Sequence, residues 1–265
     1  RFRRHALEHA DGHPRVLAVA ECLAHLKQGS PGNTLEALEL IYLYFIFGEH
    51  IDHMQVRSLG NLDRILYPYY RRDLENKTFE EAHIREFIDY FLMQFASIDN
   101  YWGHPFYLGG TRADGGSEFN ELSLLILEEF EKLNIPSPKI QLKIADSTPA
   151  ELLDKALDMV RRHNSSLVFV SENAIQRAFM GLGFSPEEAR TCDVNGCYEY
   201  DVRGREVKTA PIYLNLLKPM ELVFFNGIDP GTKIECGCRT GELETIRSFD
   251  DFYHAYFRQL DFLLE

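Results

Sequence analysis

The chain lacks an apolar run long enough to cross a bilayer. Its most apolar stretch, residues 38–47, is interrupted by Glu39 and followed by Glu49 and His50, whereas a transmembrane helix needs about 20 apolar residues. No signal peptide is visible. The 265 residues carry a formal net charge of −13 at pH 7, and negative charge disfavours nucleic acid and anionic lipid. We therefore expect neither nucleic acid nor membrane as a partner.

Cysteine is scarce, and its number is odd. The chain has five cysteines at uneven spacing, whereas a disulfide framework calls for an even set. This usage predicts a reducing compartment, and we expect a cytoplasmic location. Tandem repeats, low-complexity segments and long runs of like charge are also missing, and the length suits one or two domains.

Hydrophobic periodicity predicts a helix-rich chain with a few short strands. Helices are expected at residues 15–27, 33–45, 79–97, 118–133, 148–163 and 212–225, with another beginning at 185, and strands at 140–144 and 166–170. Asn33, Thr148 and Ser185 are the expected N-caps. The glycine-rich residues 227–241 read as a loop. Strands that alternate with helices predict an α/β layer or barrel with functional loops at strand ends.

The tetrad Gly196-Cys197-Tyr198-Glu199 places a thiol and a carboxylate two residues apart. We predict an extended segment over residues 194–200, in which alternate side chains point the same way. Cys197 and Glu199 would then share one face and form a catalytic pair. On spacing alone, the favoured alternative is a small buried residue beside a surface glutamate.

The charges around Cys197 argue against a cysteine hydrolase. A nucleophilic thiolate needs a nearby cation, and no His, Lys or Arg lies within five residues. Glu199 would raise the pKa of the thiol further. These surroundings suit a sulfur that carries a hydrogen atom, because no charge then develops on it.

Further motifs accompany the tetrad in order along the chain. They are residues 58–70 (SLGNLDRILYPYY), Gly109-Gly110 with Asp114-Gly115, Asn120-Glu121-Leu122-Ser123, residues 168–173 (VFVSEN), residues 185–190 (SPEEAR), Asn215-Leu216, Glu221-Leu222 and Thr240-Gly241. With the Gly-Cys-x-Glu tetrad, this series resembles the glycyl radical enzymes, the pyruvate formate-lyase-like family. The resemblance implies an α/β fold: a helix-rich part of a ten-stranded α/β barrel, incomplete in this chain.

The resemblance also implies a mechanism. In the family, a glycyl radical withdraws hydrogen from the loop cysteine, and the thiyl radical then attacks a small-molecule substrate while the glutamate acts as base. Carried over by position, Cys197 is the thiyl residue and Glu199 the base. A radical S-adenosylmethionine activating enzyme installs the glycyl radical, and the full-length protein is expected to be a homodimer.

One family motif is missing from the chain. The family's Arg-Val-x-Gly-Tyr radical loop has no counterpart, because the sequence contains no Gly-Tyr pair. We therefore expect residues 1–265 to be part of a pyruvate formate-lyase-like domain without its N-terminal part and its glycyl radical domain. Such a fragment would bind no cofactor and would be inactive alone.

The loop also bears on the reaction. Pyruvate formate-lyase proper carries adjacent cysteines, whereas the partner nearest to Cys197 is Cys192. This favours cleavage of a C–O, C–N, C–S or C–C bond, as in the dehydratase, lyase and decarboxylase members. Acyl transfer with coenzyme A, of the formate C-acetyltransferase type, is one alternative, and a non-catalytic binding protein that retains the fold is another.

Two departures disfavour glycerol, propanediol and choline as substrates. Diol dehydratase-like members carry a second acid about a dozen residues after the glutamate, where this chain has Thr209-Ala210-Pro211. Their Asn-Gly-His stretch is also missing, and His53-Met54-Gln55 stands near its place.

Glu172, His104 and His53 are the predicted substrate-binding residues. Glu172 follows a predicted buried strand, and an equal alternative is a carboxylate that stabilises a helix N-terminus. His104 ends an aromatic segment that borders a pocket or forms an ordinary aromatic corner. His50 and His53 have metal-pair spacing, but a helix-end cluster is favoured. Cys236 and Cys238 are interpreted as incidental loop cysteines rather than half of a metal site, so no metal is predicted.

Overall fold

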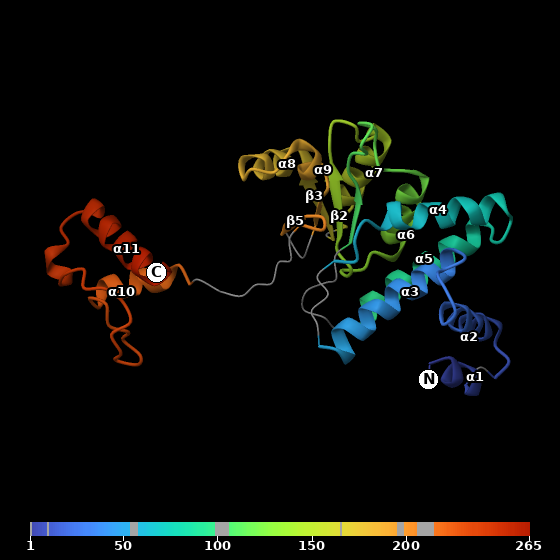
Figure 1. Ribbon diagram of the computed structural model, residues 1–265, viewed down its shortest axis with the longest axis horizontal. Coiled ribbons are helices and arrows are strands. Elements are labelled where there is room, and N and C mark those ends of the chain that lie inside the picture. Colours follow the sequence, from blue (N-terminus) through green and yellow to red (C-terminus); the bar gives the residue numbers. More distant parts are fainter. Residues whose placement is uncertain are drawn as a thin grey trace. The chain divides into compact units, whose positions relative to one another are not determined.

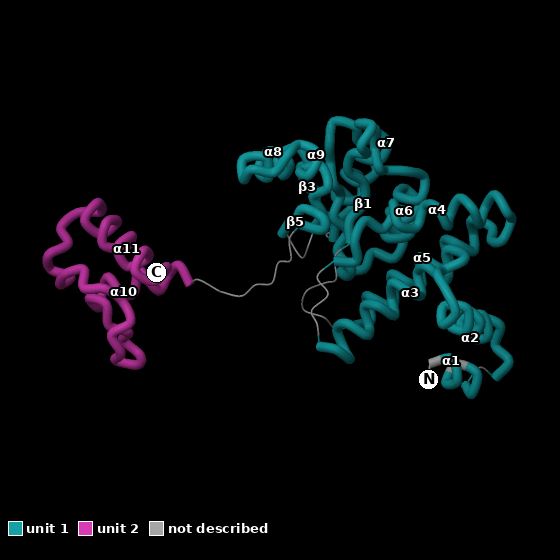
Figure 2. Tube along the Cα trace, viewed as in Figure 1, with its two compact units in different colours: residues 1–207 teal, residues 208–265 magenta. Residues whose placement is uncertain are grey.

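The computed structural model describes residues 2–9, 11–53, 58–98, 106–164, 166–194, 199–205 and 215–265. The chain divides into two compact units, residues 1–207 and residues 208–265 (Figure 2). The assignment of residues 1–265 to one domain stays a prediction. No helix within the described ranges is both long and apolar enough to span a membrane.

The first half of unit 1 is helical. Its elements are α1 (Phe2–Glu8), α2 (Pro14–Leu26), α3 (Thr34–Ile46), the π-helix η1 (Phe47–Ile51), α4 (Leu62–Glu75) and α5 (Glu81–Ser97). Apolar side chains on α3, α4 and α5 meet in one core, where Phe45, Leu66 and Phe95 have no exposed surface. Their helical spacing therefore places a single apolar stripe of each helix against the others.

The second half of unit 1 contains a parallel sheet. Its strands β1 (Phe106–Gly109), β2 (Ile140–Ile144) and β3 (Leu167–Ser171) lie in that order, linked by α6 (Glu121–Leu133) and α7 (Ala150–Arg161) (Figure 1). Phe106 pairs with Ile140, and Ile140 with Leu167. Parallel strands joined by helices confirm the predicted helix-rich α/β fold. No barrel closes among the described strands.

A short hairpin follows the sheet. After α8 (Glu172–Gly181) and α9 (Pro186–Arg190), strands β4 (Cys192–Val194) and β5 (Tyr200–Val202) pair antiparallel. Val194 is the registered partner of Tyr200. In the sequence, the tetrad stands between these two strands. Residues 195–198, which make up most of the extended segment expected over 194–200, lie outside the described residues, so that expectation stays a prediction.

Two of the three expected N-caps are confirmed. The Asn33 side chain accepts a hydrogen bond from the Glu36 N–H at 2.9 Å, and Ser185 forms a reciprocal capping box with Glu188. Thr148 does not cap α7. Its hydroxyl accepts from the Ala145 N–H at 2.9 Å, and the helix begins after Pro149.

Unit 2 packs two helices around a glycine-rich loop. Its elements are α10 (Leu217–Phe224), the 3₁₀ turn η2 (Leu243–Thr245) and α11 (Phe249–Leu264). The helix expected at residues 212–225 begins later, where Asn215 accepts from the Leu217 N–H, and residues 212–214 lie outside the described ranges. Buried Gln259 accepts from the Cys238 N–H and donates to the Cys238 carbonyl. These bonds give the loop around Cys238 a structural anchor.

Candidate active site

The carboxyl ends of the three parallel strands carry a group of buried polar residues. In open parallel sheets, this edge is where ligands bind. Lys143 lies near the end of β2 and Glu172 directly after β3, with Lys143 Nζ 3.3 Å from Glu172 Oε1. Thr111, two residues past β1, donates a hydrogen bond to Glu172 Oε2 at 2.7 Å. All three strand ends thus meet in one charged cluster.

Gly110 makes this close approach possible. Its backbone has φ +105°, and a Cβ there would lie 3.1 Å from Glu172 Oε1 and 3.4 Å from Lys143. A larger residue would be strained at that φ and would press on the ion pair. The Gly109-Gly110 motif therefore has a local structural reason.

Asp63 and Ser123 hold the end of β1 from the other side. The Asp63 carboxylate accepts from the Gly109 N–H at 3.0 Å and from the Ser123 hydroxyl at 2.6 Å. Asn61 donates to the Gly109 carbonyl at 2.8 Å. Ser123 in turn forms a capping box with Asn120 at the start of α6. Three motifs that lie apart in the sequence therefore meet around Gly109.

Burial perturbs the acidity of Asp63. Complete burial raises its pKa to about 7, although the hydrogen bonds from Ser123 and Gly109 act in the opposite direction. The carboxyl group takes up a proton near neutral pH, far above the usual range for aspartate.

A pH-dependent stability follows from this raised pKa. The folded state binds more protons than the unfolded state between the unfolded pKa near 4 and the folded pKa near 7. The stabilisation is full below about pH 4 and is lost as pH rises toward 7, by roughly 1.4 kcal/mol per pH unit at most. We expect the wild-type chain to lose more unfolding free energy than Asp63→Asn between pH 5 and pH 7 in urea titrations. Parallel pH dependences for the two proteins would contradict this.

The β4–β5 hairpin is tied to this edge. Lys143 Nζ donates to the Cys192 carbonyl at 2.7 Å, and it lies 5.3 Å from the Tyr107 ring centre. Within the hairpin, Arg203 binds both carboxylate oxygens of Asp193 at 2.7 and 2.9 Å. Sheet and hairpin therefore share one polar network around Lys143.

Three groups near Lys143 have pKa values that differ from their ordinary ones. Burial favours the neutral acid of Asp193, but the Arg203 guanidinium outweighs it and holds the pKa of Asp193 below its usual range. Burial and the Asp193 charge raise the pKa of Tyr107. Burial also raises the pKa of Cys192 to about 11. Cys192 is therefore a thiol at neutral pH and a poor nucleophile.

The predicted site residues fall in different places. Cys197 and His104 lie outside the described residues. Glu199 is exposed, immediately before β5, and Glu172 is completely buried as the first residue of α8. His53 is exposed at φ +55°, two residues past η1. The network brings Glu172 to the hairpin that carries the tetrad, and their roles toward a substrate stay predictions.

The sequence analysis missed several residues of this network, among them Lys143, Asp63, Asp193 and Arg203. Lys143 offered little signal, because Ile140–Ile144 alternates apolar residues with Gln141 and Lys143, which is typical of a strand with one polar, exposed face. Asp63 stood inside a quoted motif without a role. The pairing of Asp193 with Arg203 depends on the hairpin register, which the sequence analysis did not predict.

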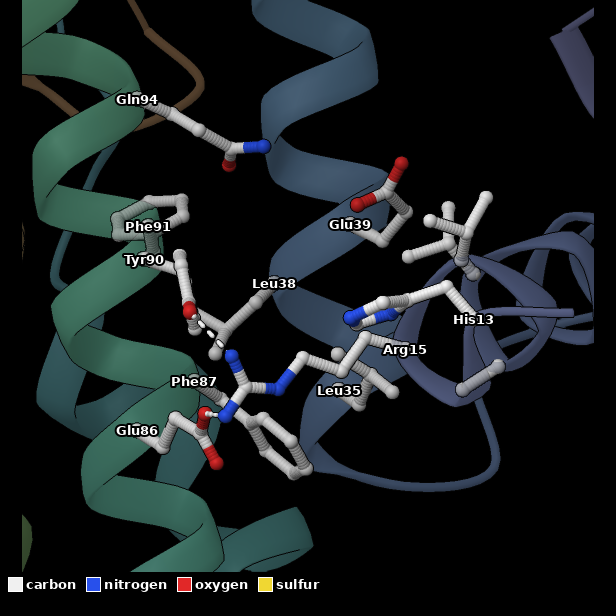
Figure 3. A pocket seen from close by; sticks show the side chains of 13 residues that line it. His13, Arg15, Leu35, Leu38, Glu39, Glu86, Phe87, Tyr90, Phe91 and Gln94 are labelled. Carbon is white, nitrogen blue, oxygen red and sulfur yellow. Dashed lines mark hydrogen bonds and ion pairs between the residues drawn. The ribbon is translucent and has the colours of Figure 1, made fainter. Parts of the chain in front are cut away.

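A separate cavity of about 510 Å³ lies among α2, α3 and α5 (Figure 3). Its wall is mostly apolar, with Leu38, Phe87 and Phe91 among its residues. Arg15 crosses it to bind the Glu86 carboxylate and the Tyr90 hydroxyl. The cavity shares no lining residue with the network at the sheet edge.

Three groups of residues are considered as possible metal ligands. Among the described residues, one group of three side chains lies close enough to share an ion: His5, Glu8 and His9, all exposed on and just after α1. Neither the His50–His53 pair nor the Cys236–Cys238 pair belongs to such a group within the described ranges.

Several known proteins are similar in sequence to this chain. The chain is 27% identical to trans-4-hydroxy-L-proline dehydratase of Clostridioides difficile over 268 aligned residues. The aligned region covers 94% of this chain and 34% of that protein. It is 27% identical over 223 residues to (2S)-3-sulfopropanediol dehydratase of Klebsiella oxytoca, covering 77% and 27%. The glycyl radical subunit of 4-hydroxyphenylacetate decarboxylase of C. difficile is 24% identical, covering 93% and 31%. The chain thus spans roughly a third of the length of these relatives.

Structure and family comparisons agree. The crystal structure of hydroxyproline dehydratase from C. difficile with trans-4-hydroxy-L-proline bound superposes with a TM-score of 0.80 at 25% identity, over 99% of this chain and 35% of that one. The model of the family described as pyruvate formate lyase-like matches residues 3–265. The relatives are dehydratases and a decarboxylase, as the Gly-Cys-x-Glu tetrad predicts. The chain belongs to the pyruvate formate lyase-like family of glycyl radical enzymes.

Proposed function

We propose that the complete protein is a glycyl radical lyase that eliminates a leaving group from a small hydroxylated substrate, with Cys197 as hydrogen-atom carrier and Glu199 as base. The observation that carries the proposal is the convergence of the family's motifs. Residues of four of them, Asp63, Gly109, Ser123 and Glu172, meet at the sheet edge to which the tetrad's hairpin is tied.

The proposed reaction is a sequence of hydrogen-atom and proton transfers. The glycyl radical of the complete protein would supply one unpaired electron by taking the hydrogen atom of the Cys197 thiol. Cys197 sulfur then takes a hydrogen atom from a substrate carbon, which breaks the C–H bond and forms an S–H bond. Glu199 accepts the proton of the hydroxyl or amino group on that carbon, and the leaving group on the neighbouring carbon departs with its bonding electrons and takes up that proton. The thiol then returns its hydrogen atom to the product radical, and the resulting thiyl radical would take a hydrogen atom back from the glycine.

The residues beside Cys197 in the sequence support radical rather than ionic chemistry there. No His, Lys or Arg lies within five residues of Cys197, whereas a thiolate nucleophile needs a nearby cation. Hydrogen-atom transfer needs no such cation, because it leaves sulfur uncharged. We further propose that the complete protein works as a homodimer with a radical S-adenosylmethionine activating enzyme.

We also propose Glu172, His104 and His53 as residues of the substrate pocket. Because Glu172 is buried and paired with Lys143 and Thr111, its contribution would be to shape the pocket floor rather than to contact substrate directly. Trans-4-hydroxy-L-proline and (2S)-3-sulfopropanediol, named in the two dehydratase relatives, are the first substrates to assay.

Product analysis tests the reaction class. The activated complete protein is incubated anaerobically with hydroxylated amino acids, sulfonates and arylacetates, with and without coenzyme A. We expect elimination or decarboxylation without coenzyme A. Formation of acetyl-coenzyme A from pyruvate would establish the acyltransferase alternative instead, and absence of any turnover would favour a binding protein.

Glu199→Gln tests the base. The amide keeps the shape but cannot accept the substrate proton, so we expect kcat to fall about 10²- to 10⁴-fold. The radical content of the activated protein should stay unchanged, because that step does not use the carboxylate. Glu188→Gln, which alters a glutamate in the capping box of α9, is the matched control. Equal rates for Glu199→Gln and the control would refute the assignment.

A further inference from the structure

Lys143 is a buried cation in the middle of the site's framework. It is 4% exposed, although it lies on a strand whose neighbours Ile140 and Leu142 are completely buried apolar residues. An ammonium in such surroundings persists only when it is paired and hydrogen-bonded. The mechanism proposed above gives it no chemical step.

The partners of Lys143 come from three different elements. Glu172, at the start of α8, supplies the counter-charge at 3.3 Å. The Tyr107 ring of β1 lies 5.3 Å from its nitrogen. The backbone carbonyl of Cys192, which is the first residue of β4, accepts a hydrogen bond from Lys143 Nζ at 2.7 Å. The ammonium therefore contacts the start of α8, the neighbouring strand β1 and the first residue of the hairpin.

The hairpin itself is stiff near this point. The bidentate Asp193–Arg203 pair and the registered pairs from Cys192–Val202 to Val194–Tyr200 join its two strands. A shift at Cys192 is therefore passed to both Val194 and Tyr200, which flank the tetrad. A bidentate pair with carboxylate resists such a shift better than a single bond does.

We propose that Lys143 is the positioning residue of the Cys197 loop, because it locks the first residue of the β4–β5 hairpin to the carboxyl edge of the parallel sheet. The inference rests on the proposed function for its catalytic meaning. Reacting atoms must lie within a fraction of an ångström of the productive geometry, and a misplacement of about 1 Å can cost about 10²-fold in rate.

A set of variants separates an effect on the position of the Cys197 loop from an effect on the stability of the fold. Lys143→Met removes the hydrogen bond and leaves the buried Glu172 carboxylate without its counter-charge, although the Thr111 hydroxyl still donates to it. Lys143→Met/Glu172→Gln removes the hydrogen bond and both charges, which restores stability when no buried charge is left alone. Lys143→Arg keeps charge and donors. Lys27→Met changes an exposed lysine and serves as the matched control.

The first readout is the rate at which iodoacetamide alkylates Cys197 in the folded 265-residue chain, followed by peptide mass spectrometry. The Cys236 and Cys238 peptides provide internal references. We expect the rate of Cys197 alkylation to change about tenfold in Lys143→Met and in Lys143→Met/Glu172→Gln. A change of this size corresponds to the loss of one hydrogen bond to a charged group. Thermal stability should fall in Lys143→Met and recover in the double variant. Lys143→Arg and Lys27→Met should alkylate like the wild type.

The second readout is turnover per radical spin in the activated complete protein. We expect kcat to fall about 10²-fold in the double variant at unchanged radical content, with substantial recovery in Lys143→Arg. Wild-type alkylation in the double variant, or alkylation that simply follows thermal stability across the set, would overturn the proposal. Because alkylation needs no radical, it decides the role of Lys143 even if the complete protein proves to have no lyase activity.

Discussion

Cys197→Ala in the complete protein should abolish turnover while leaving the glycyl radical in place. The methyl group of alanine can neither lose nor return a hydrogen atom under the reaction conditions, so the relay between radical and substrate is cut. We expect a loss of roughly 10⁴-fold or more, the scale on which removal of a central reactive side chain acts. The measurement is product formed per spin, with spins counted by electron paramagnetic resonance before substrate is added.

Cys192→Ala is the control for this experiment. Cys192 lies five residues earlier, but its side chain is buried and burial raises its pKa to about 11. We expect its replacement to leave most of the turnover intact. A loss of turnover in Cys192→Ala as large as that in Cys197→Ala would indicate a two-cysteine mechanism like that of pyruvate formate-lyase proper, and would contradict the single-cysteine relay.

Gly109→Ala should unfold or severely destabilise unit 1. The residue has φ +76°, and a Cβ there would lie 2.1 Å from Phe119 Cζ, with two more ring atoms within 2.4 Å. The left-handed backbone costs about 1–2 kcal/mol for alanine, and overpacking a buried ring adds about 1–3 kcal/mol or more. We expect the unfolding free energy to fall by about 2–5 kcal/mol in total, measured by urea denaturation.

Gly115→Ala isolates the backbone part of that effect. Gly115 has a similar φ of +84°, but nothing lies within 4 Å of the position that a Cβ would occupy. Its replacement should therefore cost only the conformational strain, about 1–2 kcal/mol. If both alanine variants were destabilised equally, contact with Phe119 would not explain the requirement for glycine at the end of β1.

Local sequence patterns predicted much of the secondary structure. Helices α2, α3, α5 and α6, the strand Ile140–Ile144 and the capping box at Ser185 follow from spacing and from neighbours within a few residues. These features depend on contacts inside one turn or one strand. Thr148 shows the limit of such reasoning, because its hydroxyl accepts from the Ala145 backbone instead of capping α7.

The site itself depends on contacts that no local pattern contains. The hairpin register joins Val194 to Tyr200, and no local pattern in the sequence predicts this pairing. Lys143 meets Cys192 across 49 residues, and Ser123 meets Asp63 across 60. The quoted motifs indicated which segments matter, but only the packing of the strands shows that Asp63, Gly109, Ser123, Lys143 and Glu172 belong together.

The most direct test of the account is the electron paramagnetic resonance spectrum of the complete protein after anaerobic treatment with its radical S-adenosylmethionine activating enzyme. We predict a stable organic radical signal that is present in wild type and in Cys197→Ala, with substrate consumed only by the wild type. Absence of any radical signal from the complete, folded wild-type protein, or equal substrate consumption by Cys197→Ala, would contradict the assignment of a radical lyase that works through Cys197.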